Sequence, residues 1–177
     1  MRWDLLFADL EGQLAHAEAA DDRAVLGEEE LHRAAAEPLR DRLATLAGAH
    51  REVRVVLHGG EALELRLASA GEDWVAGAAD RVALVIPLCA VASVIVSDSP
   101  GPAAGPGLGA SASRASLTAV LRDLARRGER LEVMLASGAV GGRVVRVGRD
   151  HLELREGGDE RVRSRLVPFA AIRCIRC

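Results

Sequence analysis

Two stretches of the chain repeat the same order of strand-like segments and turns, and this repeat constrains the fold more than any other feature. Three pairs of segments correspond: Val53–Leu57 with Leu131–Leu135, Ala70–Val75 with Val147–Leu152, and Val85–Val91 with Leu166–Ile172. The offset between the copies drifts only from 78 to 77 to 81 residues, so the gaps lie in turns. We therefore infer an internal duplication, in which each copy is one structural unit.

Within each copy, apolar and polar residues alternate, as they do in strands that are buried on one face. Five short strands with tight glycine turns are predicted between Arg51 and Val96, and a second set from Glu129 to the C-terminus. Many short strands joined by tight turns are typical of a small β-barrel.

A helix is predicted before each copy. Apolar residues recur three and four apart from Trp3 to Ala17 and from Leu31 to Leu46, and Pro38 is expected to start a new helix or to kink a long one. A second helix is expected from Ser113 to Arg127, ending at Gly128. The expected organisation is a helical segment (1–37), a first unit (38–97), a flexible Gly/Pro/Ala linker (98–113) and a second unit (114–177).

The end of the second copy carries a family resemblance. The run Val167-Pro168-Phe169-Ala170-Ala171-Ile172 lies where bacterial Sm-like RNA chaperones carry Val-Tyr-Lys-His-Ala-Ile, and the order of elements over Pro38–Val96 and Arg114–Cys177 resembles the Sm-like fold. The resemblance implies an α+β chain with a helical N-terminal segment and two small five-stranded Sm-like (SH3-like) β-barrels, each preceded by a helix. The whole chain, with its opening Trp3–Glu11, also resembles an uncharacterised actinobacterial family whose members are sometimes labelled transcriptional regulators.

In Sm-like RNA binders the resemblance would imply a uridine pocket, built from a stacking side chain and an amide that reads the base edge. This sequence departs from that pattern at each point. It has no Asn, and the Tyr-Lys-His positions are Pro168–Ala170 in the second copy and Pro87–Cys89 in the first. The Arg-Gly-Asp or Arg-Gly-Asn form of the tail is absent as well, so the usual pocket is not carried over to any residue.

Charge is distributed unevenly along the chain. Residues 1–50 hold eleven acids and five Arg, whereas residues 114–177 hold fourteen Arg and eight acids, and Lys is absent. The acidic and basic ends either pair with each other, within one chain or between chains, or the basic end meets an outside polyanion.

An arginine-rich face is predicted on the second unit. Its members are Arg161, Arg163 and Arg165, which alternate along one strand, together with Arg143, Arg146 and Arg149. One interpretation is a solvated strand face, and the other is a patch that contacts the phosphates of a nucleic acid such as RNA. Since no aromatic residues are interleaved with these arginines, binding of this kind would be weakly sequence-specific and sensitive to salt.

The sequence shows no catalytic arrangement. It has no pair of acids in a catalytic arrangement and no nucleophile next to a base, and its five His residues share no ligand spacing. Asp73 and Asp150 are expected to be turn residues that bond their own backbone, and His151, which matches Trp74, is expected to be half-buried beside its turn. We therefore expect no enzyme, no cofactor and no small-molecule substrate.

The pair Cys174 and Cys177 has the Cys-x-x-Cys spacing of metal and redox sites. The first copy has Ser93 and Val96 at these places, so the fold does not need the thiols, and we expect no metal site. The start of the chain is not an apolar signal segment, and no run approaches the roughly 20 apolar residues of a membrane-spanning helix, so a cytoplasmic protein without membrane association is expected.

Together these patterns predict a non-catalytic assembly or interaction module. Self-association is expected through the edge strands of the barrels or through the N-terminal helix, which otherwise packs on the rest of the chain or docks a protein partner. Two barrels on one chain either satisfy each other's edges or build a ring from half as many chains. The alternative function is nucleic-acid binding by the Arg-rich face of the second barrel.

Overall fold

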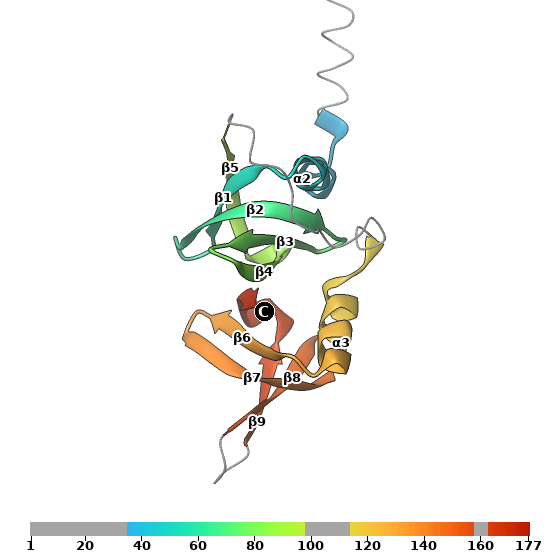
Figure 1. The fold of residues 1–177 in the computed structure, drawn as a ribbon, viewed down its shortest axis with the longest axis vertical. Helices are drawn as coiled ribbons and strands as arrows, with labels where there is room; N and C mark the ends of the chain where they lie inside the picture. Colours follow the sequence, from blue (N-terminus) through green and yellow to red (C-terminus); the bar gives the residue numbers. More distant parts are fainter. Residues whose placement is uncertain (1–34, 98–113, 158–162) are drawn as a thin grey trace, which may run out of the picture. The chain divides into compact units, whose positions relative to one another are not determined.

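The computed structural model describes residues 35–97, 114–157 and 163–177 (Figure 1). Most of the predicted N-terminal helical segment, the predicted linker 98–113 and the candidate residue Arg161 therefore lie outside the described residues. The chain divides into Met1–Pro38 and Leu39–Cys177, and both copies of the repeat belong to the second, compact unit.

The two described helices stand where the apolar spacing predicts them. Helix α2 spans Leu39–Gly48 and packs on strand β2, and helix α3 spans Leu117–Arg127 and packs on strand β7. Ser116 caps α3 by accepting a hydrogen bond from the backbone N–H of Ala119. Gly128 ends α3 in the left-handed conformation, with φ 65°, which confirms the predicted stop.

Within the described part of the chain, ten strands follow from the alternating segments. Those of the first half are β1 Glu52–Leu57, β2 Ala62–Ala70, β3 Trp74–Ala79, β4 Val82–Pro87 and β5 Val91–Val96. Those of the second half are β6 Arg130–Leu135, β7 Gly138–Val147, β8 His151–Glu156, β9 Arg163–Pro168 and β10 Ile172–Arg176. A single 3-10 turn, at Leu88–Ala90 and again at Phe169–Ala171, precedes the last strand of each half.

All ten strands belong to one antiparallel sheet in the order β5-β1-β2-β3-β4-β10-β6-β7-β8-β9. Each half thus follows the same internal order of fifth, first, second, third and fourth strand. The register shifts recur as well, because the β2–β3 shift at Leu67/Ser69 matches the β7–β8 shift at Val144/Arg146. The α+β class and the duplication of the strand pattern are therefore seen in the structure.

The described residues form two hydrophobic clusters, one for each half, and each contains at least one residue from the other half. Trp74, Ala76 and Val85 of the first half belong to the cluster built mainly by the second half. Cys174 of the second half belongs to the cluster built mainly by the first half. The two sets of strands are therefore packed into each other, beyond being joined along the sheet.

Candidate functional site

The junction between the halves is the pairing of strand β4 with strand β10. Ile175 lies opposite Val85 and Arg176 lies opposite Leu84. The backbone N–H of Cys177 extends the pairing by donating to the carbonyl oxygen of Ala83 at 2.9 Å. One edge strand of each half is covered in this way, and β5 and β9 are left as the outermost strands of the sheet.

A second contact between the halves joins the β2–β3 turn to the start of helix α3. The carboxylate of Asp73 accepts a hydrogen bond from the backbone N–H of Leu117 at 2.6 Å. The indole N–H of Trp74 donates to the carbonyl of Ala115 at 2.9 Å, and the N–H of Glu72 donates to the same carbonyl at 3.1 Å. The sequence predicted a local role for Asp73, and this is corrected, because its carboxylate stabilises the first turn of a helix 44 residues away.

The turn that makes this contact depends on a glycine. A Cβ atom on Gly71 would lie only 2.1 Å from the indole nitrogen of Trp74 and 2.6 Å from the oxygen of Ala115. Trp74 is fully buried. Glycine at this position therefore allows the ring to fold back over the turn and to reach the second half.

The matching turn of the second half has the same backbone but faces solvent. The N–H of Gly148 donates to the carbonyl of His151 at 2.8 Å, as that of Gly71 does to the carbonyl of Trp74 at 2.8 Å. His151 Nδ1 lies 2.8 Å from Asp150 Oδ1, and this hydrogen bond lowers the pKa of the Asp150 carboxyl below its ordinary value. The side chain of Asp150 is 87% exposed and that of His151 39% exposed, so His151 is half-buried as predicted.

The two outermost strands carry exposed apolar side chains. Ile95 on β5 is 53% exposed and Leu166 on β9 is 65% exposed. Val96, also on β5, is exposed as well. Edge strands present unpaired backbone N–H and carbonyl groups, and apolar edges of this kind favour pairing with another strand.

The described candidate arginines do not all share one face of the sheet. Arg143 on β7 lies opposite Arg155 on β8, and both point away from the face of their buried neighbours Val144 and Leu154. Arg165 on β9 lies opposite Leu154, which is buried, so Arg165 points to the other face of the sheet. A nucleic acid bound by the whole predicted set of arginines would therefore have to contact both faces of the sheet. Nucleic-acid binding stays a prediction.

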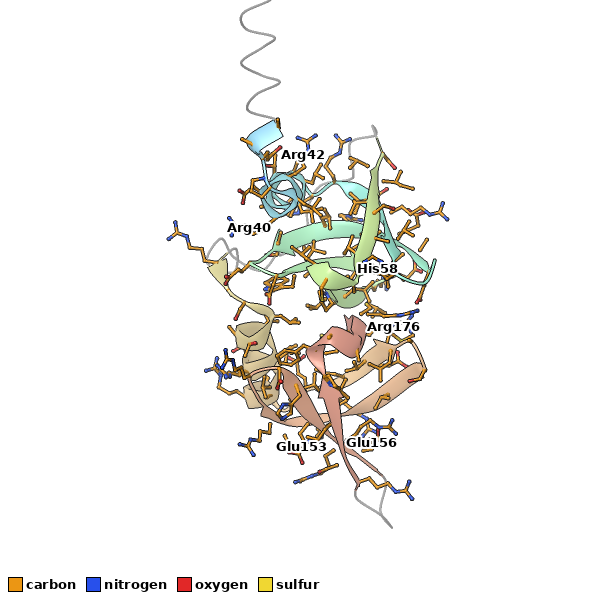
Figure 2. All side chains as sticks on the ribbon, turned by 180° about the vertical axis from the view of Figure 1, so that it is seen from behind. Arg40, Arg42, His58, Glu153, Glu156 and Arg176 are labelled. Atoms are coloured by element: carbon orange, nitrogen blue, oxygen red, sulfur yellow. The ribbon has the colours of Figure 1, made fainter. Side chains whose placement is uncertain are left out.

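The remaining candidates divide in the same way. Arg163 shares its face with Arg165, because the two lie two positions apart along β9, and Arg165 forms an ion pair with Glu156. Arg146 lies opposite Glu153, one of the acidic side chains labelled in Figure 2, and Arg149 lies in the exposed turn before His151. These positions place an acid beside two of the candidates.

Arg143, one of the predicted candidates, belongs to a row of three arginines that crosses three strands, and the sequence pattern did not single out the other two. Arg130 on β6 lies opposite Arg143 on β7, which in turn lies opposite Arg155 on β8. All three side chains are exposed, and like charges placed directly opposite each other in a sheet are destabilising. The row could have been found only from the register between strands, since the three residues are far apart in sequence.

The cysteine pair does not form a dithiol site. Cys174 is buried in the first-half cluster, and burial raises the pKa of its thiol to about 12. Cys177 is exposed and directly follows strand β10, three positions after Cys174, so the alternation of an extended chain would put the two side chains on opposite faces. Among the described residues, no group of three or more His, Cys, Asp or Glu side chains could hold a metal ion.

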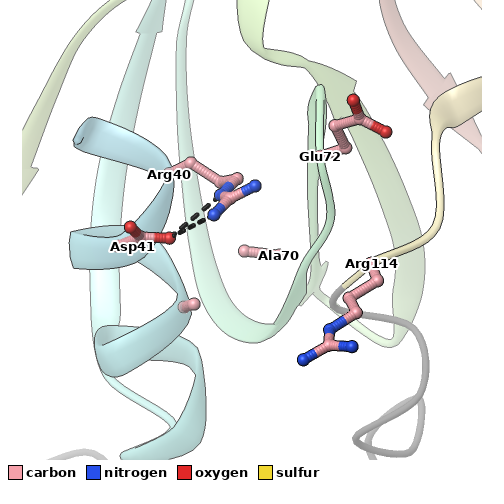
Figure 3. A pocket seen from close by; sticks show the side chains of 6 residues that line it. Arg40, Asp41, Ala70, Glu72 and Arg114 are labelled. Atoms are coloured by element: carbon pink, nitrogen blue, oxygen red, sulfur yellow. Dashed lines mark hydrogen bonds and ion pairs between the residues drawn. The ribbon is translucent and has the colours of Figure 1, made fainter.

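A cavity of about 420 Å³ opens between helix α2 and the β2–β3 turn (Figure 3). It is lined by Arg40, Asp41, Ala44, Ala70, Glu72 and Arg114. Arg40 is already bonded to Asp41, at 2.8 Å and 2.9 Å, and Glu72 and Arg114 add one charge of each sign. A lining with balanced charges of this kind does not indicate a particular ligand.

Searches against protein-family models and against curated proteins found no match to this chain. No helix of the described residues is long and apolar enough to cross a membrane.

Proposed function

We propose that this chain is a non-catalytic, tandem Sm-like assembly module, whose copies associate head to tail by pairing strand β9 of one chain with strand β5 of the next. The observation that carries the proposal is the β4–β10 junction, which joins the fourth strand of one half to the fifth strand of the other. The two outermost strands, β9 and β5, are the fourth strand of the second half and the fifth strand of the first. The same type of pairing is thus left unmade once at each end.

The strand order supports the Sm-like part of the proposal. Each half has the order fifth, first, second, third, fourth, follows a helix that packs on its second strand, and has a 3-10 turn before its last strand. In this proposal each half is a small five-stranded barrel. Head-to-tail pairing either closes into a ring or continues as a filament, and the resemblance favours the ring.

The residues of the two free edge strands, β9 and β5, also support pairing between two copies of the chain. Transferred onto them, the register of the β4–β10 junction puts Leu166 opposite Val94, where the junction has Val85 opposite Ile175. It also puts Arg165 opposite Ile95, where the junction has Leu84 opposite Arg176. Each junction then holds one aliphatic pair and one pair of an arginine with an aliphatic residue.

The experiment introduces either a positive or a negative charge at one position of the edge strand β5. Light scattering and sedimentation velocity of the wild-type chain should give an oligomer. Ile95→Arg places a second positive charge opposite Arg165 and should dissociate the oligomer, whereas Ile95→Glu places a negative charge there and should preserve it. Val145→Arg is the control, because Val145 is also an exposed apolar residue but lies on the inner strand β7.

Two results would contradict the assembly proposal. A wild-type chain that is monomeric at all concentrations excludes it. An oligomer that survives Ile95→Arg as well as it survives Val145→Arg shows that another surface carries the association.

A second candidate function is polyanion binding by the arginine row of Arg130, Arg143 and Arg155. The cross-strand register favours it, because a phosphate group bound over the row would relieve the repulsion between three neighbouring guanidinium groups.

RNA and DNA binding is measured at about 50 mM and at about 200 mM salt, because phosphate contacts weaken steeply between these concentrations. The triple alanine variant of the row should lose binding, and the triple variant of Arg40, Arg42 and Arg54, which removes the same charge elsewhere, should retain it. Equal loss in both variants would exclude a defined row.

A further inference from the structure

We propose that the exposed turn Arg149–His151 receives the first turn of helix α2 from a second copy of the chain. The carboxylate of Asp150 would accept the backbone N–H of the second copy's Leu39, whose side chain would pack beside His151. This inference rests on the proposed head-to-tail assembly and adds to it a second contact, which does not involve the edge strands.

The template for this contact is present within the chain. At the β4–β10 junction, the turn of one half reaches the helix of the other, through Asp73 to the N–H of Leu117 and through Trp74 to the carbonyl of Ala115. Strand pairing and the contact between turn and helix thus occur together at the same junction. A second junction of the same geometry, between β9 and β5 of two chains, brings the corresponding turn and helix together.

The corresponding residues follow from the offsets of the repeat. Leu39 matches Leu117 as the first residue of its helix, 78 positions earlier, which is the offset of the strands that follow each helix. The turn residues Asp150 and His151 match Asp73 and Trp74, 77 positions later. Each residue of the internal contact therefore has a counterpart at one of the two ends.

The exposure of these counterparts is what we expect of residues that form this contact between two chains and not within one chain. Leu117 is only 3% exposed and belongs to the same cluster as Trp74, whereas Leu39 is 53% exposed. Trp74 is completely buried, whereas His151 is half-buried and Asp150 is almost fully exposed. A large apolar residue at the start of a helix and an acid at a turn are thus exposed at opposite ends of the repeat.

The second-half turn can make the hydrogen bond without breaking its own. Asp150 uses Oδ1 to bond His151, and a carboxylate has a second oxygen that can accept another donor. Pro38 precedes Leu39 and offers no side-chain oxygen as a cap, in contrast to Ser116 before Leu117. A carboxylate from another chain therefore suits the start of α2, where the helix dipole favours negative charge.

The turn also has room for the larger ring of the first half. A Cβ on Gly148 would come within 2.5 Å of the His151 ring, as a Cβ on Gly71 would collide with the ring of Trp74. Both glycines thus leave space for an aromatic ring to fold over the turn. His151→Trp should therefore reproduce the first-half turn and strengthen the contact.

The test measures the dissociation constant of the assembly by sedimentation velocity of the full chain. Asp150→Ala removes the acceptor and should weaken association roughly tenfold, and Asp150→Asn, which keeps one acceptor oxygen, should recover part of the loss. Leu39→Asp puts a second acid against Asp150 and should weaken association at least as much. His151→Trp should tighten it by roughly tenfold, because more apolar surface is buried. Glu64→Ala removes an exposed acid from β2 and is the control.

The outcomes separate this contact from the assembly itself. A wild-type chain that does not associate overturns both proposals. A wild-type chain that associates, with unchanged dissociation constants for Asp150→Ala and Leu39→Asp, overturns the turn-to-helix contact alone. Because Leu39 and Asp150 are exposed and His151 is half-buried, thermal unfolding at concentrations that keep the chain monomeric should change little between wild type and variants, which confirms that folding is intact.

Discussion

The indole N–H of Trp74 donates a hydrogen bond to the carbonyl oxygen of Ala115, which lies 41 residues further along the chain. The ring itself belongs to the hydrophobic cluster of the second half, although Trp74 is the first residue of strand β3 in the first half. One side chain thus contributes both packing and a polar contact across the junction between the two copies.

Replacing the Trp74 ring should reduce the stability of both halves. Trp74→Phe keeps much of the apolar volume but loses the hydrogen bond to Ala115, and we expect a loss of about 1–2 kcal/mol in the free energy of unfolding. Trp74→His, which copies the second-half turn, should cost about 3 kcal/mol because it also leaves a cavity. Urea unfolding followed by far-UV circular dichroism measures both losses. Equal stability of all three proteins would contradict the role of the ring.

The two matched aspartates should differ in their effect on folding. Asp73→Ala leaves the N–H of Leu117 without its acceptor and should destabilise the chain by about 1–2 kcal/mol, as the loss of a helix cap does. Asp150→Ala should change the stability of the monomer by less than about 0.5 kcal/mol, because its carboxylate is exposed. Chemical denaturation of the two variants at low protein concentration makes the comparison, and similar losses would argue against the contact between Asp73 and helix α3.

The buried thiol of Cys174 should react only after unfolding. Its pKa is raised to about 12 by burial, so the thiolate that reacts with a disulfide reagent is absent at neutral pH, whereas Cys89 is exposed. Because the pKa of this group is raised on folding, its contribution to stability is complete below the ordinary value of 9.0 and is lost as the pH rises towards 12. Reagent titration of a Cys89→Ser, Cys177→Ser variant, with and without denaturant, isolates Cys174. Rapid reaction in the native protein would contradict the buried position.

The ion pairs of Asp123 near the end of helix α3 should stabilise the folded chain, and this stabilisation should be lost in acid. The hydrogen bond from Arg126, helped by the charge of Arg127, lowers the pKa of Asp123 below 3.8. A carboxyl whose pKa is lowered on folding stabilises the chain above its unfolded pKa, and this contribution is lost as the pH falls through the folded value. Between about pH 5 and about pH 2, wild type should therefore lose more stability than Asp123→Asn. If the free energies of unfolding of the two proteins fall equally over this pH range, the ion pairs contribute nothing.

Much of the local structure could be predicted from residue spacing. The alternation at Val53, Val55 and Leu57 and its counterparts placed the strands, and Gly128 marked the end of α3 in the conformation that glycine tolerates best. The comparison of the two copies was the strongest signal, because it located matching turns without any knowledge of the fold.

Relations between distant residues could not be predicted. The residues Arg130, Arg143 and Arg155 are brought together only by the register of three strands, which depends on the turns between them and on a register shift in β7. The partner of Asp73 was missed for a related reason, because an Asp before an aromatic residue in a turn has the same pattern whether it bonds its own backbone or another element. The second-half turn, where Asp150 bonds the adjacent His151, has that same pattern.

The exchange of Cys174 and Trp74 between the two clusters has a consequence for how this protein holds together. Either copy expressed alone would have an incomplete interior, so two separate chains would have to meet in solution before either could be stable. Covalent continuity makes that encounter unimolecular, with an effective concentration that dilution cannot change. The duplicated copies are then free to diverge at their outer ends, since the strength of their mutual contact no longer depends on how much protein is made.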